Sequence, residues 1–252
     1  GIKSIANVTE KIVPFMAALY VGTALIIIFM NFTKIGDVFN LIFQGAFTPE
    51  AGLGGVIGVL IQGFRRAAFS NEAGVGSASI AHSAAKTNEP VSEGIVALLE
   101  PFIDTVVICT MTAIVIIITG FPVSTEFVGE GAQMTSAAFG SVFSWFPYVL
   151  VFAIFLFAFS TMISWSYYGL KSWTFLFGKT KLSVYAYKFL FLVFIVIGSS
   201  VKLAAVLDFS DMMILAMAFP NIIGLLILSK EVKIDLDDYY KRLKSGVIKK
   251  FK

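Results

Sequence analysis

The sequence predicts an all-α integral membrane protein with six membrane spans, one of which is discontinuous. Three observations lead to this prediction. Of the 252 residues, 58% are hydrophobic and only 14% are charged, and the mean hydropathy is +0.88, which excludes an ordinary soluble domain. Six apolar runs come close to the ~20 residues that an α-helix needs to cross a bilayer. One of these runs is interrupted in its middle by charged residues and glycines.

The apolar runs give the bounds of the predicted spans, which belong to a single transmembrane domain. They cover residues 12–30, 53–85 (the broken span), 94–119, 147–170, 184–199 and 203–228. Residues 34–47 have apolar residues at helical spacing, so we predict a helix along the outer membrane surface, with an irregular loop as the alternative. Residues 229–252 are charged with mixed sign, and we predict that they form a solvated cytoplasmic tail.

The distribution of basic residues predicts the orientation in the membrane. If the N-terminus is cytoplasmic, 15 of the 19 Lys and Arg residues fall on the inner side, and the connection at 120–146 contains none. The positive-inside rule expects this of an external loop. We therefore predict a multi-pass protein of the plasma (inner) membrane, with both termini of the chain in the cytoplasm.

The second span is the most informative segment of the chain. It reads GGVIGVLIQGF, then RRAAFSNEAG, then VGSASIAHSAAK. The first piece, Leu53 to Phe64, would rise about 18 Å as a helix, which is too short for a hydrocarbon core of about 30 Å. The polar continuation must complete the crossing, and lipid would penalise it unless it faced protein or a cavity. We therefore predict a discontinuous helix, a feature with which secondary transporters bind solute and ion. The alternative is a loop between two short re-entrant pieces without a ligand.

Two carboxylates in the third span predict a set of ion pairs. Glu100 and Asp104 are four residues apart, on one face of the helix, and Pro101 between them is expected to bend it. Because like charges repel at this spacing, we predict that Arg65 and Arg66 neutralise them in structural ion pairs between helices. A bound cation or a shared proton stays open as the alternative.

The fourth span places hydroxyl groups on one side of an apolar helix. In the stretch FAFSTMISWSYYG, Ser160 and Ser164 are four residues apart, and so are Thr161 and Trp165. Hydroxyl oxygens suit a hard monovalent cation that must shed its water. Ser and Thr in membrane helices also commonly bond back to the carbonyl of the preceding turn, and then need no further role.

These segments together resemble one known family. The stretches GFRRAAFSNEAGVGSASIAHSAA, EPVSEGIVALLEPFIDT and FAFSTMISWSYYGLK are similar to the alanine or glycine:cation symporter (sodium:alanine symporter) family of sodium-coupled amino-acid carriers. The resemblance covers essentially the whole chain. It implies a LeuT-type fold, in which the chain holds the second inverted repeat plus the preceding helix. The first core helix and the three helices after it would then lie on a missing N-terminal half, and the start at Gly1 rather than Met agrees with a fragment.

The resemblance also implies which residues form the site. Ser160 and Thr161 fall where the eighth helix of this fold supplies hydroxyl ligands to sodium. The unwound segment would line the substrate cavity, and Trp165 could close it. The residues of that segment are Phe69, Ser70, Asn71, Glu72, Ala73 and Gly74. The expected partners are therefore a sodium ion, a small neutral amino acid and the lipid bilayer, with no cofactor and no nucleic acid.

The predicted function is sodium-coupled symport of a small neutral amino acid such as alanine or glycine by alternating access, with this chain as the C-terminal part of the carrier. A proton-coupled carrier and a channel or pore subunit are the alternatives. The channel has less support because the sequence has no filter-like repeat or ring of charge. An enzyme is not expected, since the sequence has no zinc-ligand spacing and no Gly-x-Ser-x-Gly elbow.

Overall fold

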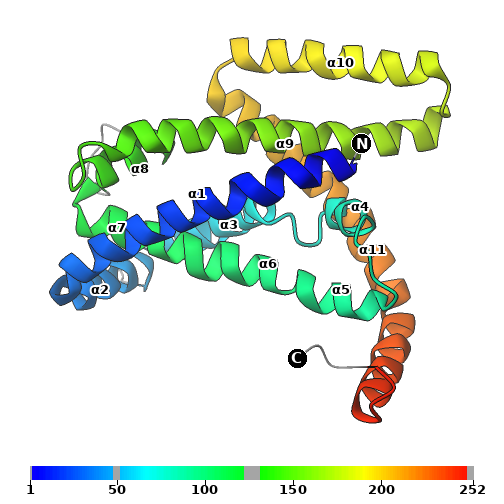
Figure 1. The fold of residues 1–252 in the computed structure, drawn as a ribbon. Coiled ribbons are helices and arrows are strands. Elements are labelled where there is room, and N and C mark those ends of the chain that lie inside the picture. The colour runs from blue at the N-terminus through cyan, green and yellow to red at the C-terminus, as the bar shows by residue number, and fades with distance from the viewer. Residues whose placement is uncertain (1, 48–51, 122–130, 249–252) are drawn as a thin grey trace. The chain divides into compact units, whose positions relative to one another are not determined.

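The computed structural model describes residues 2–47, 52–121 and 131–248, and every regular element in these ranges is a helix (Figure 1). This confirms the predicted all-α class. The chain divides into two compact units. The first unit consists of Gly1–Phe64 and Val106–Val206, and the second unit consists of Arg65–Thr105 and Leu207–Lys252.

Five helical stretches of the described residues are long and apolar enough to cross a membrane. They are Val13–Met30, Pro90–Ile118, Phe146–Phe177, Lys181–Ser200 and Leu203–Lys244. Val13–Met30 is the apolar part of helix α1 (Ile2–Met30). The predicted broken span is formed by two helices, α3 (Gly52–Ser70) and α4 (Ser77–His82).

A proline sets the form of the stretch Pro90–Ile118. Helices α5 (Pro90–Ala97) and α6 (Leu99–Pro101) lead into the π-helix η2 (Phe102–Cys109), and α7 (Thr110–Ile118) completes it. The α-helix is interrupted at Leu98, in the turn before Pro101, and widened π-helical turns follow Pro101. The bend itself stays a prediction. Proline has no N–H to donate and its ring crowds the preceding turn, so a regular α-helical ladder cannot continue through it.

The core of the first unit lies where α1 meets three other helices. Helix α1 packs on α7 and on α9 (Phe146–Phe177), and α8 (Gly131–Gly140) packs on both of these. Fully buried aromatic rings fill the centre, with Phe139 and Phe146 stacked at 4.6 Å between ring centres. The Tyr20 hydroxyl lies 2.6 Å from Thr112 Oγ1, which adds one polar link between α1 and α7. Helix α2 (Ile35–Phe47) follows the short 3₁₀ turn η1 (Phe32–Lys34), so the helix predicted at 34–47 is present.

Helices α9 and α10 (Lys181–Ser200) form a tight antiparallel hairpin (Figure 1). The Trp173 indole donates to Ser183 Oγ at 3.0 Å, close to the turn. Gly169 allows the two helices to approach, because a Cβ atom there would lie only 2.1 Å from the Tyr187 hydroxyl. Any larger residue at this position would push Tyr187 away from α9.

Helix α11 (Leu203–Lys244) continues well past the predicted end of the last span. It has 42 residues, whereas the apolar run that defined the span ends at residue 228. Most of the tail predicted at 229–252 is thus helical. Lys, Arg, Glu and Leu, which have high helix propensity, recur through residues 230–244. A span defined by hydropathy alone does not consider this propensity.

Replacing Phe139 by Ala should destabilise the first unit. The substitution leaves a cavity beside Phe146 and Tyr20, and we expect a loss of about 3 kcal/mol in the free energy of unfolding, the lower end for buried Phe. Unfolding by dodecyl sulfate, followed by tryptophan fluorescence, measures this. Phe175→Ala is the matched control, since Phe175 is 88% exposed. Equal losses for the two variants would contradict the assigned core.

Candidate functional site

The segment predicted as the second span is interrupted between Ser70 and Ser77, so the break lies later than expected. That the two helices form one discontinuous span stays a prediction. Helix α3 does not end near Phe64. It continues through Arg65 and Arg66 to Ser70, and reaches 19 residues. The added residues, RRAAFS, include Arg and Ala, which favour helix, so the charged pair lies on the helix and the unwound part is confined to residues 71–76.

Three residues turn the backbone away from helical geometry. Gly74 and Gly76 have φ of +79° and +106°, which glycine adopts without a steric penalty. Glu72 has φ of +56°, a conformation that costs a non-glycine residue about 1 to 3 kcal/mol. Asn71 helps to form the turn, because its Oδ1 accepts the N–H of Ala73 at 3.0 Å. Strain at Glu72 is typical of a segment that neighbouring structure holds in place.

Neighbouring helices hold the unwound segment through polar side chains. Asn71 donates through Nδ2 to Thr105 Oγ1 of η2 at 2.6 Å. From α11, Asn221 donates through Nδ2 to the carbonyl of Gly74 at 2.8 Å. A Cβ at Gly76 would lie 3.3 Å from the Asn221 side chain, so glycine permits this close approach. The break is therefore clamped from two sides.

Two further hydrogen bonds join the ends of the break. Ser70, the last residue of α3, donates to the carboxylate of Asp104 on η2. Ser77, the first residue of α4, is 2% exposed and donates to the carboxylate of Glu72. A bond to a charged acceptor is roughly twice as strong as one between neutral groups. Both helix ends are thus tied to acidic side chains at the break.

The arginines of α3 form ion pairs, but with partners other than those predicted. Arg65 donates through Nε to Asp211 Oδ2 and through Nη2 to Asp208 Oδ1, both at 3.0 Å. Arg66 also binds Asp211. The predicted pairing with Glu100 and Asp104 is therefore wrong. Asp208 and Asp211 lie on α11, and the cluster of two arginines and two aspartates has no net charge.

Asp211 is the centre of this cluster. Its side chain is 4% exposed, whereas that of Asp208 is 75% exposed. A buried carboxylate requires a counter-charge, which Arg65 and Arg66 provide. Within the described part of the chain, Asp211 Oδ1 and Arg66 Nε are buried without a hydrogen-bond partner. The pairing therefore neutralises charge without using every donor and acceptor.

Glu100 lies near the histidine of α4 instead of the arginines. His82 Nδ1 is 2.7 Å from Glu93 Oε1 of α5, and His82 Nε2 is 3.6 Å from Glu100 Oε2. His82 thus lies between two carboxylates, one on α5 and one on α6. A protonated imidazole would interact favourably with both.

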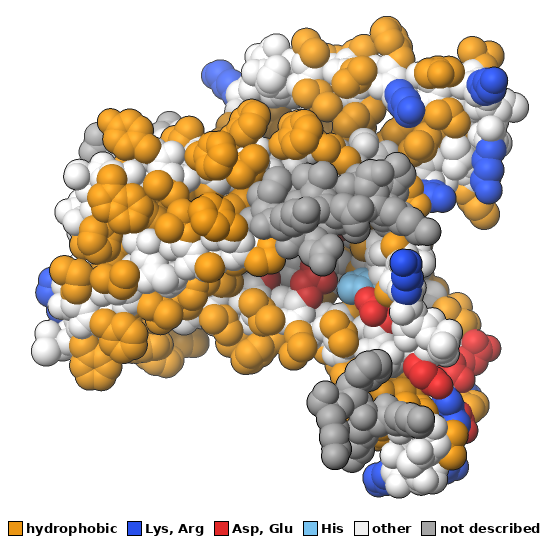
Figure 2. Space-filling view, in the orientation of Figure 1, with side chains coloured by type: hydrophobic (Ala, Val, Ile, Leu, Met, Phe, Trp, Pro, Cys, Tyr) orange, Lys and Arg blue, Asp and Glu red, His pale blue; other side chains and the backbone are white. Residues whose placement is uncertain are grey.

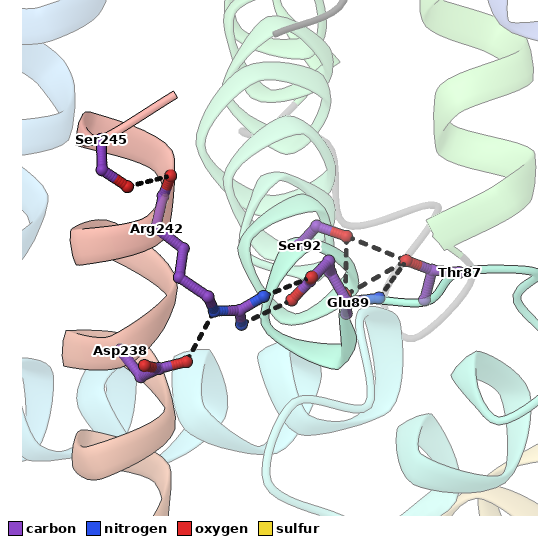
Figure 3. Close-up of polar contacts among 6 residues, drawn as sticks. All are labelled: Thr87, Glu89, Ser92, Asp238, Arg242 and Ser245. Atoms are coloured by element: carbon purple, nitrogen blue, oxygen red, sulfur yellow. Dashed lines mark hydrogen bonds and ion pairs between the residues drawn. The ribbon is translucent and has the colours of Figure 1, made fainter. Parts of the chain in front are cut away.

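The end of α11 is attached to the segment that follows α4 (Figure 3). The Arg242 guanidinium donates to both oxygens of Glu89, at 2.6 Å and 2.8 Å, and its Nε donates to Asp238 at 2.7 Å. Thr87 and Ser92 surround Glu89 with a further set of hydrogen bonds. The hydrogen bonds from Arg242 hold the pKa of Glu89 below its usual value. This bidentate pair fixes the connection between α4 and α5.

The residues expected to bind sodium lie on α9, in the first unit. Ser160 donates through Oγ to the carbonyl of Phe157 at 2.9 Å, so the back-bonding alternative is present for this residue. Trp165 makes an edge contact with Tyr168, with ring centres 6.0 Å apart. As site residues, Ser160, Thr161 and Trp165 stay predictions.

Sequence reasoning missed the residues of α11 that complete the second unit. Asp208, Asp211 and Asn221 all lie in an otherwise apolar span. The signal was available, because ionisable residues within a span are functional candidates by default. Asp208 and Asp211 are also three residues apart, which places them on one helix face. Their partners could not be read from that spacing.

Comparison with known proteins identifies the family. Residues 1–252 match the sequence profile of the Sodium:alanine symporter family. The chain belongs to the sodium:alanine symporter family. This confirms the resemblance seen in the unwound segment and in α9, and the members of this family are transporters rather than enzymes.

Relatives of this family in several organisms are similar along nearly the whole chain. The sodium/alanine symporter AgcS of Methanococcus maripaludis is 41% identical over 233 residues, which are 91% of this chain and 51% of that protein. The probable sodium/glutamine symporter GlnT of Bacillus subtilis is 39% identical over 98% of this chain and 51% of its own length. An uncharacterized transporter of Haemophilus influenzae is 39% identical over 97% of this chain and 54% of its own length.

The chain thus spans about half the length of the curated relatives that it matches. These matches do not by themselves support the expected missing N-terminal half of the carrier. They do place the unwound segment and the clamps around it in a region that these relatives share.

Replacing Asp211 by Asn should destabilise the second unit strongly. Arg65 and Arg66 would lose their buried counter-charge, and breaking a buried pair costs about 3 to 5 kcal/mol. Asp208→Asn is the matched control and should cost less than about 1 kcal/mol, because exposed pairs contribute little. Unfolding by dodecyl sulfate measures both. A larger effect at Asp208 than at Asp211 would refute this assignment.

The Glu89–Arg242 pair should make stability depend on pH. A carboxyl whose pKa is lowered in the folded state stabilises it fully above its unfolded pKa of about 4.3. This contribution is lost as the pH falls through the lowered native value. The difference in unfolding free energy between wild type and Glu89→Gln should therefore be constant from about pH 5.5 to 7 and shrink below about pH 4.3. Glu231→Gln, an exposed change on α11, is the control. A difference that grows on acidification would contradict the lowered pKa.

Proposed function

We propose that this chain forms the C-terminal part of a sodium-coupled symporter for a small neutral amino acid such as alanine or glycine. The observation that carries the proposal is the unwound segment at 71–76, which α11 and η2 clamp through Asn221 and Thr105. A helix that opens its backbone at membrane depth offers carbonyl and amide groups to a ligand. Family membership supplies the reaction, which is transport.

The proposed substrate residues are Phe69 to Gly74. A zwitterionic amino acid needs an acceptor for its ammonium group, and the carbonyls at the C-terminal end of α3 carry the negative end of the helix dipole. The side chain of Phe69 supplies an apolar wall, and the Arg66 guanidinium lies 5.6 Å from its ring centre. Glycine at position 74 lets a small ligand approach the backbone, since no Cβ intervenes. Trp165 is proposed as a further substrate contact.

The proposed sodium residues are Ser160 and Thr161 of α9. The Ser160 hydroxyl donates its proton to the Phe157 carbonyl, but a hydroxyl keeps two lone pairs that can accept or coordinate. The hydrogen bond to Phe157 therefore orients the Ser160 oxygen and leaves its lone pairs available for a cation. Sodium prefers such hard oxygen ligands, as calcium does. Alternating access between the two sides of the membrane would then couple the sodium gradient to uptake.

The proposed architecture is the second inverted repeat of a LeuT-type fold plus the preceding helix. In support, the unwound segment at 71–76 separates α3 from α4, as the broken helix of this repeat would require, and α1 precedes them. We also propose a plasma-membrane location with both termini of this chain in the cytoplasm. The charge distribution supports this orientation, because it places 15 of 19 basic residues inside.

Proton coupling is a second candidate, and one observation favours it. His82 lies between Glu93 and Glu100, so an imidazole and two carboxylates, all groups able to hold a proton, are in contact. A proton held there would be released if α4 moved relative to α5 and α6. Uptake that follows a pH gradient in sodium-free buffer, and is lost in His82→Gln, would favour this candidate over sodium coupling.

Uptake of labelled alanine by the protein translated from the complete reading frame, reconstituted in proteoliposomes, tests the proposal. An inward sodium gradient should drive accumulation, and potassium in place of sodium should abolish it. Ser160→Ala with Thr161→Ala should raise the sodium concentration for half-maximal uptake at least about tenfold, since a bond to an ion is worth roughly 1.5 to 3 kcal/mol.

Ser199→Ala on α10 is the matched control, because Ser199 also bonds back to a carbonyl of its own helix, that of Val196 at 2.8 Å. It should leave the sodium dependence unchanged. Uptake that saturates with alanine but is indifferent to sodium would refute the coupling ion while leaving a carrier. Flux that rises linearly with alanine concentration would refute the carrier in favour of a pore.

A further inference from the structure

Helices α9 and α10 line a groove that has no role in the proposed transport reaction and could hold a ligand. It encloses about 500 Å³ and has almost entirely apolar walls, which run from Phe159 to Leu170 on α9 and from Tyr187 to Ile195 on α10. The Ser166 hydroxyl in its wall donates to the carbonyl of Ile163 at 2.8 Å, so it does not make the interior polar. The groove lies wholly within the first unit.

The length of the groove matches one leaflet of a bilayer. The residues from Phe159 to Leu170 rise by about 17 Å along a helix at 1.5 Å per residue. One leaflet contributes about half of a hydrocarbon core of ~30 Å. A single extended acyl chain therefore fits along the groove in the direction of the helix axes.

One end of the groove is polar and basic. Lys188 and the Tyr187 ring belong to its wall there. The Lys171 ammonium lies 5.2 Å from the ring centre of Tyr167, which also lines the groove. Tyr and Lys at one level of a membrane helix pair are typical of the headgroup region, where their apolar parts stay buried and their polar ends reach water.

The charge of the surrounding sequence has one sign. From residue 131 to residue 207 the sequence contains five lysines and no Asp, Glu or Arg. Lys179 and Lys181 lie at the turn between α9 and α10, beyond the end of the groove that Tyr187 and Lys188 line. Figure 2 shows lysines and no acidic side chains over α10 on the face drawn. Basic pockets between membrane helices bind anionic lipid headgroups.

We propose that this groove binds one anionic phospholipid. Its acyl chain lies between α9 and α10, and Lys171 and Lys188 bind the phosphate. Charge complementarity favours this occupant over a second copy of the chain, whose identical lysines would repel. A zwitterionic lipid has a cationic group beside its phosphate, which weakens its attraction to the lysines. The predicted inner location of these lysines agrees with the leaflet that carries anionic lipid.

The protein translated from the complete reading frame, purified in a neutral detergent, tests the proposal by native mass spectrometry. Phosphatidylglycerol should bind as a single retained lipid, in clear preference to phosphatidylcholine with the same acyl chains. Lys171→Gln with Lys188→Gln should weaken phosphatidylglycerol binding roughly 25-fold, since each basic residue near the anionic group is worth about a factor of five. Phosphatidylcholine binding should be unchanged.

Lys34→Gln with Lys202→Gln is the matched control, because it removes the same charge from two exposed lysines outside the groove. It should leave phosphatidylglycerol binding unchanged. Ile163→Trp fills the groove and should abolish retention even with both lysines present. Glycerol 3-phosphate alone should not displace the lipid. Displacement by it would show a free-phosphate site, and equal binding of both lipids, or an unchanged double variant, would overturn the proposal.

Discussion

A backbone that leaves helical geometry must find new hydrogen-bond partners, and the polar contacts of the second unit are arranged around this requirement. Each unpaired amide or carbonyl costs several kcal/mol in a medium without water. At residues 71–76 the partners are side chains. Asn71 supplies an acceptor to its own turn and a donor to Thr105, and Asn221 supplies a donor to the Gly74 carbonyl. The unwound segment, η2 and α11 therefore depend on one another, and none of them can be repacked separately.

The same requirement governs the charges. Two arginines on α3 need two carboxylates, and the predicted partners, Glu100 and Asp104, do not pair with them. Asp211 does, although it is 145 residues from Arg66. Once α11 pairs with α3, Asp104 is free to receive Ser70 and Glu100 to lie near His82. Spacing along one helix shows that a charge needs a partner, but which helix supplies it depends on packing, and one sequence does not contain that information.

The features predicted correctly from the sequence are those with local causes. Long apolar runs indicated the helices that can span a membrane. Glycines and a Ser-Asn-Glu run indicated the break, and Pro101 indicated the irregular turns in the stretch Pro90–Ile118. The features that were missed have distant or marginal causes. Helix α3 continues to Ser70 because its polar residues favour helix and are paired on α11, and α11 continues to Lys244, where Arg242 binds Glu89. Hydropathy indicates which residues can lie in the hydrocarbon core of the membrane. Hydrogen bonds and ion pairs determine where a helix ends.

Different interactions stabilise the interior of each unit, so the two interiors should respond differently to an applied force. Within the first unit, stacked aromatic rings and a close glycine contact dominate, and such packing has no direction and tolerates small shifts of one helix along another. Within the second unit, charged and amide groups bind at defined distances, and a hydrogen bond weakens steeply when its geometry changes. A ligand that displaced the carbonyl of Gly74 would have to move Asn221 or break its bond. The unwound segment therefore transmits an applied force to α11, whereas the apolar helix pairs of the first unit can absorb one.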